Sequence, residues 1–284
     1  MVAGTTTVVG IVGCPVSHSL SPAMHNAAFK KSGLDWVYVP FRVEPDALSE
    51  ALSGLPALGV RGVNVTVPHK ERVMEYLHSF SPEAQAIGAV NTVSVERGAL
   101  RGDNTDWLGF LRDIQELGID PGGLRVLILG AGGAARAVGY ALAISGARLI
   151  MCSSRNSGKG EAMARDLRSL AAGCETVFVP SDRCARVGGD VDIVVNSTPL
   201  GMAPMVEASP WPEEIPFPRC KLAYDLVYAP ALTRFMEQGK AAGATAANGL
   251  GMLVYQAAES FRIWTGMDAP VDVMRGAAAR LAPA

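Results

Sequence analysis

The sequence predicts an α/β protein with two open-sheet domains, one of which is a Rossmann-type nucleotide domain. Three observations predict this fold class. The chain has 284 residues, enough for two domains of roughly 100 to 200 residues each. Short apolar runs alternate with helical patterns from end to end, which is typical of mainly parallel sheets. One of the apolar runs leads directly into a glycine-rich turn and a helix, as in dinucleotide sites.

The first series of elements covers the amino-terminal third of the chain. Apolar runs separated by helical stretches predict strands at Val8–Val12, Trp36–Arg42, Gly62–Val67 and Ala89–Val95. A helix is expected over Asp106–Leu117, and the glycine-rich turn at residues 118–123 then leads into the second series.

The second series has the order expected of a nucleotide domain. Its predicted strands are Arg125–Leu129, Arg148–Ser153, Thr176–Val179, Val191–Asn196 and Lys221–Asp225, and its predicted helices are Ala134–Ser145 and Gly160–Ala171. Two later helical patterns, Met252–Thr265 and Val271–Leu281, have no strand of their own to cover. We therefore expect these C-terminal helices to pack back on the first domain. The predicted domains are residues 1–105 plus 251–284 for substrate and catalysis, and residues 106–250 for the nucleotide.

Charge and composition favour a small-molecule partner. The 25 Lys and Arg against 27 Asp and Glu give a net charge of -2, so no basic field predicts binding to nucleic acid or a membrane surface. No apolar run approaches the roughly 18 residues of a membrane span, and the start of the chain does not resemble a signal peptide. We expect a cytoplasmic protein, as a monomer or homodimer.

Neither the cysteines nor the histidines predict a metal site. The five cysteines are odd in number, scattered and without a Cys-x-x-Cys pair, which argues against a disulfide frame or a thiolate zinc site. We expect them to be buried, reduced thiols. The four histidines lack carboxylate or thiolate partners at ligand spacing, so we expect no metal.

The glycine-rich turn follows the strand at Arg125–Leu129 and matches the G-x-G-x-x-G/A pattern. In that pattern Gly130 permits the tight turn, Gly132 lets the backbone approach a pyrophosphate, and Ala135 allows close packing of helix on strand. The start of the following helix offers free N–H groups and a positive dipole end to phosphates. The predicted phosphate loop is Gly130, Ala131, Gly132, Gly133 and Ala134. The alternative is a small-residue loop without a ligand.

The tip of the next strand predicts NADP as the cofactor. NAD sites carry an acidic residue there for the ribose 2′-hydroxyl, and residues 152–157 contain no carboxylate. Arg155 can instead pair with and stack over a 2′-phosphoadenosine. Ser154, Asn156 and Lys159 would add further donors. The alternative is a solvated surface arginine.

Two loops of the first domain place hydroxyls and a lysine where strands end, the edge at which open α/β sheets bind ligands. In one, Ser19 and Ser21 would present hydroxyls to a carboxylate, although Ser21 could also be only a helix cap before Pro22. In the other, a helix is expected to start at Pro68 with Lys70 in its first turn. A lysine against the helix dipole and partly buried has a lowered pKa suited to general-base work, whereas base rates favour a surface lysine.

The third loop, residues 103–106, carries a carboxylate. Thr105 could cap the helix that follows, and Asp106 would lie in its first turn. Asp106 could orient a substrate hydroxyl beside Lys70 or keep that lysine charged. The alternative is an ordinary aspartate that complements the helix dipole. Pattern reasoning alone does not establish that the three loops meet.

The combination of motifs resembles the shikimate dehydrogenase family. The motifs in the family's order are Ser17-His-Ser-Leu-Ser-Pro22, Asn64-Val-Thr-Val-Pro-His-Lys70, Gly88-Ala-Val-Asn-Thr92, Asp103-Asn-Thr-Asp106, Gly130-Ala-Gly-Gly-Ala-Ala135 and Asn248-Gly-Leu-Gly-Met-Leu-Val-Tyr-Gln256. The resemblance spans most of the chain. Ser154-Arg155-Asn156 departs from the family's frequent Asn-Arg-Thr but keeps the arginine.

The resemblance implies roles for individual residues. Lys70 and Asp106 would be the catalytic pair, with Lys70 passing the proton while hydride moves between the nicotinamide and C3 of the substrate. The substrate's carboxylate would be held by Ser19, Ser21 and Tyr228, and its ring hydroxyls by Thr66, Asn91 and Gln256. Gly249 and the backbone around Thr198 would lie near the nicotinamide.

The implied reaction is the reversible, NADPH-dependent reduction of 3-dehydroshikimate to shikimate, a step of aromatic amino-acid biosynthesis. Within the same family, a quinate/shikimate or aminoshikimate dehydrogenase is an alternative. A non-catalytic NADP-sensing regulator is a more remote one, since it would be expected to lose Lys70 or Asp106.

Overall fold

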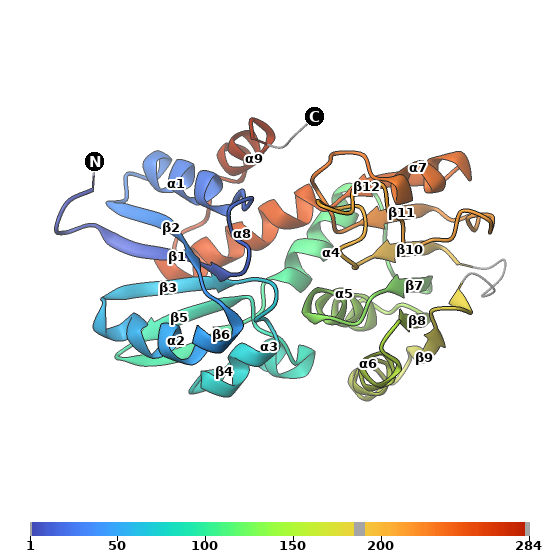
Figure 1. Ribbon diagram of the computed structural model, residues 1–284, viewed down its shortest axis with the longest axis horizontal. Coiled ribbons are helices and arrows are strands. Elements are labelled where there is room, and N and C mark those ends of the chain that lie inside the picture. The colour runs from blue at the N-terminus through green and yellow to red at the C-terminus, as the bar shows by residue number, and fades with distance from the viewer. Residues whose placement is uncertain (1, 185–190, 282–284) are drawn as a thin grey trace. The chain divides into compact units, whose positions relative to one another are not determined.

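The computed structural model describes residues 2–184 and 191–281 of the chain. These residues form two compact units, each with its own six-stranded sheet (Figure 1). The first unit contains residues 2–109 together with Leu253–Leu281, and the second contains Phe110–Met252. Met1, residues 185–190 and residues 282–284, which the predicted domains include, lie outside the described residues. Among the described residues, no helix is long and apolar enough to cross a membrane.

The sheet of the first unit is mixed, with strand order β2-β1-β3-β5-β6-β4. Its strands are β1 (Thr7–Gly13), β2 (Trp36–Arg42), β3 (Val60–Val65), β4 (Ser79–Phe80), β5 (Thr92–Glu96) and β6 (Ala99–Asp103). β5 runs antiparallel to both β3 and β6. The sequence prediction missed β6, which returns from β5 through Arg97 and Gly98. Both residues have positive φ, 52° and 83°, as a two-residue hairpin turn that matches the strand twist requires.

Helices from both ends of the chain belong to the first unit. They are α1 (Ser21–Lys31), α2 (Leu48–Ala57), α3 (Pro82–Ile87), most of α8 (Leu250–Thr265) and α9 (Val271–Ala279), with short 3₁₀ segments η1 (Pro45–Ala47) and η2 (Arg72–Tyr76). α9 packs against α1. From α8, the Trp264 indole donates to the carbonyl of Val93 at 3.1 Å, and Phe261 stacks on Phe29. The C-terminal helices therefore pack back on the first unit, as expected.

The second unit has an all-parallel sheet in the order β12-β11-β10-β7-β8-β9. Its strands are β7 (Arg125–Leu129), β8 (Leu149–Ser154), β9 (Glu175–Pro180), β10 (Ile193–Asn196), β11 (Leu222–Asp225) and β12 (Thr245–Asn248). Its helices are the later part of α4 (Asp106–Glu116), α5 (Gly133–Ile144), α6 (Ser157–Leu170) and α7 (Arg234–Ala241). Counted from β7, this is the Rossmann order, which confirms the predicted fold class. α7 and β12 were not predicted.

Candidate functional site

A buried ion pair joins the lysine and the aspartate that the sequence singled out. Lys70 Nζ lies 2.6 Å from Asp106 Oδ2, and the two side chains are only 17% and 5% exposed. A salt bridge this enclosed is poorly screened by solvent, so its charges act on whatever occupies the space beside them. Two residues 36 positions apart in the sequence thus form one charged unit.

Lys70 is held by a turn, so the prediction of a helix beginning at Pro68 is wrong. The next helical segment is the 3₁₀ segment η2, and the helix-dipole argument for Lys70 does not apply. Other segments bind this stretch and fix it as a turn. His69 Nε2 lies 2.8 Å from the carbonyl of Val43, and the N–H of Val90 donates to the carbonyl of Lys70 at 2.8 Å.

Asp106 begins α4, as predicted, and its two carboxylate oxygens have different partners. Oδ2 receives Lys70, while Oδ1 accepts from Asn91 Nδ2 at 2.8 Å. The same Asn91 nitrogen lies 3.2 Å from Gln256 Oε1. The structure therefore brings four of the predicted residues into one cluster. Thr66, half-buried at the end of β3, lies four residues before Lys70.

Asn104 bonds to the first residue of the helix. Its Oδ1 accepts from the N–H of Asp106 at 3.0 Å, whereas the Thr105 hydroxyl is directed to Asn91. Thr105 directly precedes α4, at the position predicted for it, and its hydroxyl bonds to Asn91 Oδ1 at 3.2 Å.

The two predicted carboxylate-binding serines lie at the start of α1. Ser21 is the first helical residue, and the N–H of Ser21 donates to Ser19 Oγ at 3.2 Å. The N-cap position is Leu20, which has no side-chain cap, so Ser21 is not the cap. Ser21 is 3% exposed, and its hydroxyl lies near the hydroxyl of Tyr38. Burial raises the pKa of Tyr38 well above its usual value, so Tyr38 acts as a neutral donor and acceptor.

The glycine-rich loop of the second unit contains two glycines with different reasons to be glycine. Gly130 has φ 121°, and a Cβ there would lie 2.8 Å from the carbonyl oxygen of Ser197. Gly132 has φ -87°, and a Cβ there would meet nothing within 4 Å. Neither backbone strain nor packing explains Gly132. The space in front of the α5 N-terminus is open to a ligand, as a dinucleotide pyrophosphate requires.

The predicted adenosine site lies between β8 and α6. Asn156 caps α6 by accepting from the N–H of Lys159 at 3.0 Å, and its own N–H donates to Ser154 Oγ at 3.2 Å. In these bonds the side-chain oxygens of Ser154 and Asn156 are acceptors. The Ser154 hydroxyl and the Asn156 side-chain amide can therefore still donate hydrogen bonds. Arg155 stands between them with an exposed side chain at the carboxyl end of β8. A guanidinium at this place fits a phosphate group.

A hydrogen-bonded corner at the carboxyl ends of β10 and β11 positions the predicted nicotinamide segment. Asn196 Oδ1 accepts from the N–H of Thr198 at 2.9 Å and from its hydroxyl at 2.7 Å. Asn196 Nδ2 in turn donates to Asp225 Oδ1 at 2.9 Å. Burial raises the pKa of Asp225 to about 6, against the opposing effect of donors that include Thr233. The corner holds Thr198 by groups that are themselves buried.

Two other predicted residues lie next to this corner. At Gly249 a Cβ would lie 2.3 Å from the carbonyl oxygen of Leu226, so the close approach of two backbones requires glycine there. Tyr228 is half-buried, and this burial raises the pKa of its hydroxyl.

The cysteines only partly follow the expectation. Cys152, Cys174 and Cys184 are buried, while Cys14 and Cys220 are half-buried. All five are free thiols, and burial raises the pKa of Cys152 to about 12.

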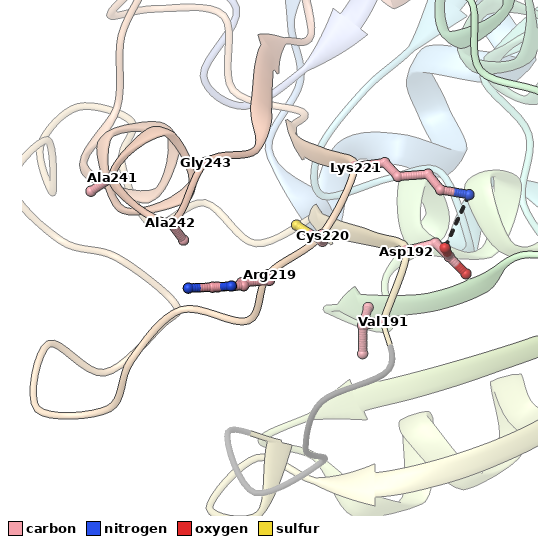
Figure 2. Close-up of a pocket in the computed structure, with 8 residues that line it drawn as sticks. All are labelled: Val191, Asp192, Arg219, Cys220, Lys221, Ala241, Ala242 and Gly243. Atoms are coloured by element: carbon pink, nitrogen blue, oxygen red, sulfur yellow. Dashed lines mark ion pairs between the residues drawn. The ribbon is translucent and has the colours of Figure 1, made fainter.

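A surface pocket of about 630 Å³ lies at the other end of the second unit's sheet (Figure 2). Its lining includes Asp192 and Lys221, whose charged atoms are 3.1 Å apart, and the side chain of Arg219. Asp192 precedes β10 and Lys221 precedes β11, so the pocket is at the amino ends of these parallel strands. None of the predicted site residues lines this pocket. Open α/β sheets bind their ligands at the carboxyl ends of the strands, which is the opposite edge of the sheet.

Comparison with known proteins gives the family. Residues 11–93 match the model of the shikimate dehydrogenase substrate binding domain, and residues 249–279 match that of the shikimate 5′-dehydrogenase C-terminal domain. A shikimate dehydrogenase (NADP(+)) of Desulforamulus reducens is 47% identical over 277 residues, which cover 96% of this chain and 94% of the relative. The chain belongs to the shikimate dehydrogenase family.

Solved structures of shikimate dehydrogenases have the same fold. One, in complex with NADP+, has a TM-score of 0.91 at 39% identity and covers 100% of this chain and 98% of that chain. The enzyme of Thermus thermophilus, in complex with NADP(H) and shikimate, has a TM-score of 0.85 at 39% identity and covers 97% and 99%. The resemblance predicted from the motifs is confirmed.

Sequence reasoning missed several buried polar residues that surround the predicted cluster in this shikimate dehydrogenase family member. They are Tyr38, Asn64, Thr92, Thr105 and Ser260, all at most 5% exposed. Asn64 stands in the quoted Asn-Val-Thr motif, which was a signal that could have been used. Thr92 and Thr105 also stand in quoted motifs, where Thr105 was considered only as a helix cap, whereas Tyr38 and Ser260 resemble ordinary strand and helix residues in the sequence.

Proposed function

We propose that this protein is an NADP-dependent shikimate dehydrogenase, which catalyses the reversible reduction of 3-dehydroshikimate to shikimate. The observation that carries the proposal is the buried pair of Lys70 and Asp106, with Asn91 bonded to the same carboxylate. Eight relatives with this name are 43–47% identical over at least 92% of the chain. The reaction is a step of aromatic amino-acid biosynthesis.

The proton is assigned to Lys70. An ammonium has three hydrogens, and one of them is directed to Asp106 Oδ2 at 2.6 Å. The others remain for the oxygen of a carbonyl substrate, so Lys70 can donate a proton as that carbonyl is reduced and take it back in the reverse direction. Asp106 fixes the direction of the ammonium and, with Asn91 and Gln256, offers polar groups to the ring hydroxyls.

The substrate's carboxylate is assigned to Ser19, Ser21 and Tyr228. Hydroxyl donors suit a carboxylate, and the first two stand at the N-terminus of α1, where the helix dipole favours negative charge. This subsite explains why the substrate is an acid.

NADPH fits the residues of the second unit and supplies the hydride when bound. Gly130, Ala131, Gly132, Gly133 and Ala134 form the open turn for its pyrophosphate, and Gly132 has no other explanation. Ser154, Arg155, Asn156 and Lys159 are assigned to the 2′-phosphate. Thr198 and Gly249 are assigned to the nicotinamide end.

Absorbance at 340 nm tests the function directly. Shikimate added with NADP should raise the absorbance rapidly, whereas NAD in place of NADP should give a much slower rise. A faster rise with quinate than with shikimate would assign the chain to the quinate/shikimate alternative. No rise with shikimate, quinate or an amino analogue, in a folded protein that binds NADP, would favour a non-catalytic NADP sensor and defeat the proposal.

We propose further that the enzyme works in the cytoplasm as a monomer or homodimer. The chain mass is 29.7 kDa, so light scattering distinguishes the two states and would reveal a larger assembly.

A further inference from the structure

A chain of buried hydrogen bonds runs through the first unit from β2 to the start of α4. Tyr38 Oη donates to Asn64 Oδ1 at 2.8 Å, and Asn64 Nδ2 donates to Thr92 Oγ1 at 3.1 Å. Thr92 Oγ1 donates to Asn91 Oδ1 at 3.0 Å, and Asn91 Nδ2 donates to Asp106 Oδ1 at 2.8 Å. The chain begins at Tyr38, and the Ser21 hydroxyl lies near the Tyr38 hydroxyl. Every member is at most 5% exposed.

The direction of this chain is fixed by backbone groups that can only donate or only accept. Asn64 Nδ2 lies 3.1 Å from the carbonyl oxygen of Asn91, which can only accept, so Asn64 Oδ1 must face Tyr38. The N–H of Thr105 donates to Asn91 Oδ1 at 2.8 Å, so Asn91 Nδ2 must face the carboxylate of Asp106. These two contacts therefore fix which side-chain atom is nitrogen and which is oxygen in both Asn64 and Asn91.

Ser260 on α8 supports the middle of the chain. Its Oγ lies 2.9 Å from Asn64 Nδ2 and 2.8 Å from Thr92 Oγ1. Its own hydroxyl donates to the carbonyl of Gln256 at 3.0 Å, so it can accept from Asn64 Nδ2, while the single Thr92 proton is used by Asn91 Oδ1. A network that is satisfied in this way holds a single arrangement, because any rotated amide would leave a buried group without its partner.

We infer that Tyr38, Asn64 and Thr92 are positioning residues that connect the carboxylate subsite at Ser21 with Asp106. The inference rests on the proposed function for the identity of the two ends. All bonds donate toward Asp106, so each donor strengthens the next one along the chain. A substrate carboxylate bound at Ser21 changes the polar surroundings of the Tyr38 hydroxyl. Recognition of the acid group is thereby coupled to the orientation of Asp106.

Two near-isosteric variants test the chain, Tyr38→Phe and Thr92→Val. Each should lower kcat for shikimate oxidation roughly three- to tenfold, the equivalent of one hydrogen bond, while KM for NADP stays unchanged. Because both act through one chain, the double variant should be no slower than the slower single variant. Thr92→Ser keeps the hydroxyl and should restore most of kcat. Multiplying effects in the double variant, or unchanged kcat in both singles, would overturn the inference.

Ser94→Ala is the matched control. Ser94 lies on β5 two residues after Thr92, is 4% exposed, and its Oγ has no hydrogen-bond partner within the described part of the chain. Losing this hydroxyl should change neither kcat nor KM. A fall in kcat equal to that of Thr92→Val would show that loss of any buried hydroxyl in this sheet lowers kcat, and it would contradict a specific role for the hydrogen-bond chain.

A readout without turnover separates this inference from the proposed function. The side-chain amide resonances of Asn91 in a ¹H–¹⁵N spectrum should move in Tyr38→Phe, which changes a distant link of the same chain, and stay in place in Ser94→Ala. Moved resonances in a protein that does not oxidise shikimate would defeat the function and keep the positioning chain. Unmoved resonances in an active enzyme would defeat the chain alone. If Tyr38→Phe does not fold, Ser260→Ala is measured by the same criteria.

Discussion

Lys70 Nζ and Asp106 Oδ2 are 2.6 Å apart, in an ion pair whose carboxylate partner is 5% exposed. The second oxygen of the same carboxylate accepts a hydrogen bond from Asn91 Nδ2, so the carboxylate cannot rotate without breaking one of these contacts. Because both carboxylate oxygens have partners, the ion pair presents a single arrangement to a substrate. Preorganised charge of this kind is what proton transfer at a carbonyl requires.

Substitution of Lys70 by alanine tests the proton's source. Lys70→Ala should lower kcat by roughly 10²- to 10⁴-fold, because general acid catalysis is lost, while KM for shikimate changes little. Steady-state kinetics in both directions measure the effect. Lys30→Ala, an exposed lysine on α1, is the control and should behave as wild type. A Lys70→Ala enzyme with more than half of the normal kcat would remove Lys70 from the mechanism.

Charge reversal at Arg155 tests cofactor choice. Arg155→Asp replaces a phosphate partner by a repelling carboxylate, so KM for NADPH should rise about tenfold or more while KM for NADH changes far less. Parallel kinetics with the two cofactors measure the ratio. Arg165→Asp, at another exposed arginine on α6, should leave that ratio unchanged. Equal increases for both cofactors would show that Arg155 does not recognise the 2′-phosphate.

Two glycine variants distinguish ligand space from packing. Gly132→Ala should leave the free energy of unfolding within about 0.5 kcal/mol of wild type, since its Cβ meets no protein atom, yet weaken NADPH binding severalfold. Gly249→Ala should destabilise the protein by about 1–3 kcal/mol, since its Cβ would lie 2.3 Å from a carbonyl oxygen. Calorimetry and NADPH titration measure both effects. Normal NADPH affinity in a stable Gly132→Ala protein would contradict the assigned pyrophosphate loop.

His25 makes the first unit sensitive to acid. It is completely buried, stacks on Tyr38 at a centroid distance of 4.4 Å, and neither ring nitrogen has a hydrogen-bond partner among the described residues. Burial lowers the pKa of His25 from 6.5 to about 3. Below pH 6.5 the unfolded chain binds a proton that the folded protein does not. His25 therefore lowers stability by about 1.4 kcal/mol per pH unit as the pH falls from 6.5 toward 3.

The variant His25→Phe isolates this effect. Relative to wild type, its free energy of unfolding should rise steadily as the pH falls from about 7 to about 4.5, because the phenyl ring has no proton to gain. Urea unfolding can be followed by fluorescence, since Trp36 and Trp264 belong to the same unit as His25. A difference between the two proteins that does not change with pH would show that His25 is protonated in the folded state as easily as in the unfolded one.

The architecture was largely predictable, since it depends on hydrophobic pattern. Apolar runs located β7 and β8, and the turn after β7 identified the Rossmann order. The missed elements carry weaker patterns. β12, Thr245–Asn248, has no branched apolar residue and lies at a sheet edge, while α7 buries only Phe235, Met236 and Gly239. Such segments are stabilised by what packs on them, which the local sequence does not encode.

The candidate site was predictable residue by residue but not as an arrangement. Lys70 and Asp106 each follow a strand, yet their meeting depends on the turn at residues 66–71, where the sequence predicted a helix. The assigned roles of the site residues remain predictions. Tyr38 and Ser260 gave no signal, because a buried hydroxyl in a strand or helix is also common in a protein core, and Thr92 was part of a quoted motif but was given no role. Their importance is visible only when their partners are known.

The membership of α8 in the first unit also sets the order in which the protein can be completed during synthesis. Ser260 and Trp264 bond to β-sheet residues made about 170 to 200 positions earlier. The second unit is continuous in the chain and can fold while the ribosome is still at work. The first unit cannot complete its core until α8 has been synthesised, so a nascent chain stalled before α8 would leave the sheet surface under Ser260 and Trp264 uncovered.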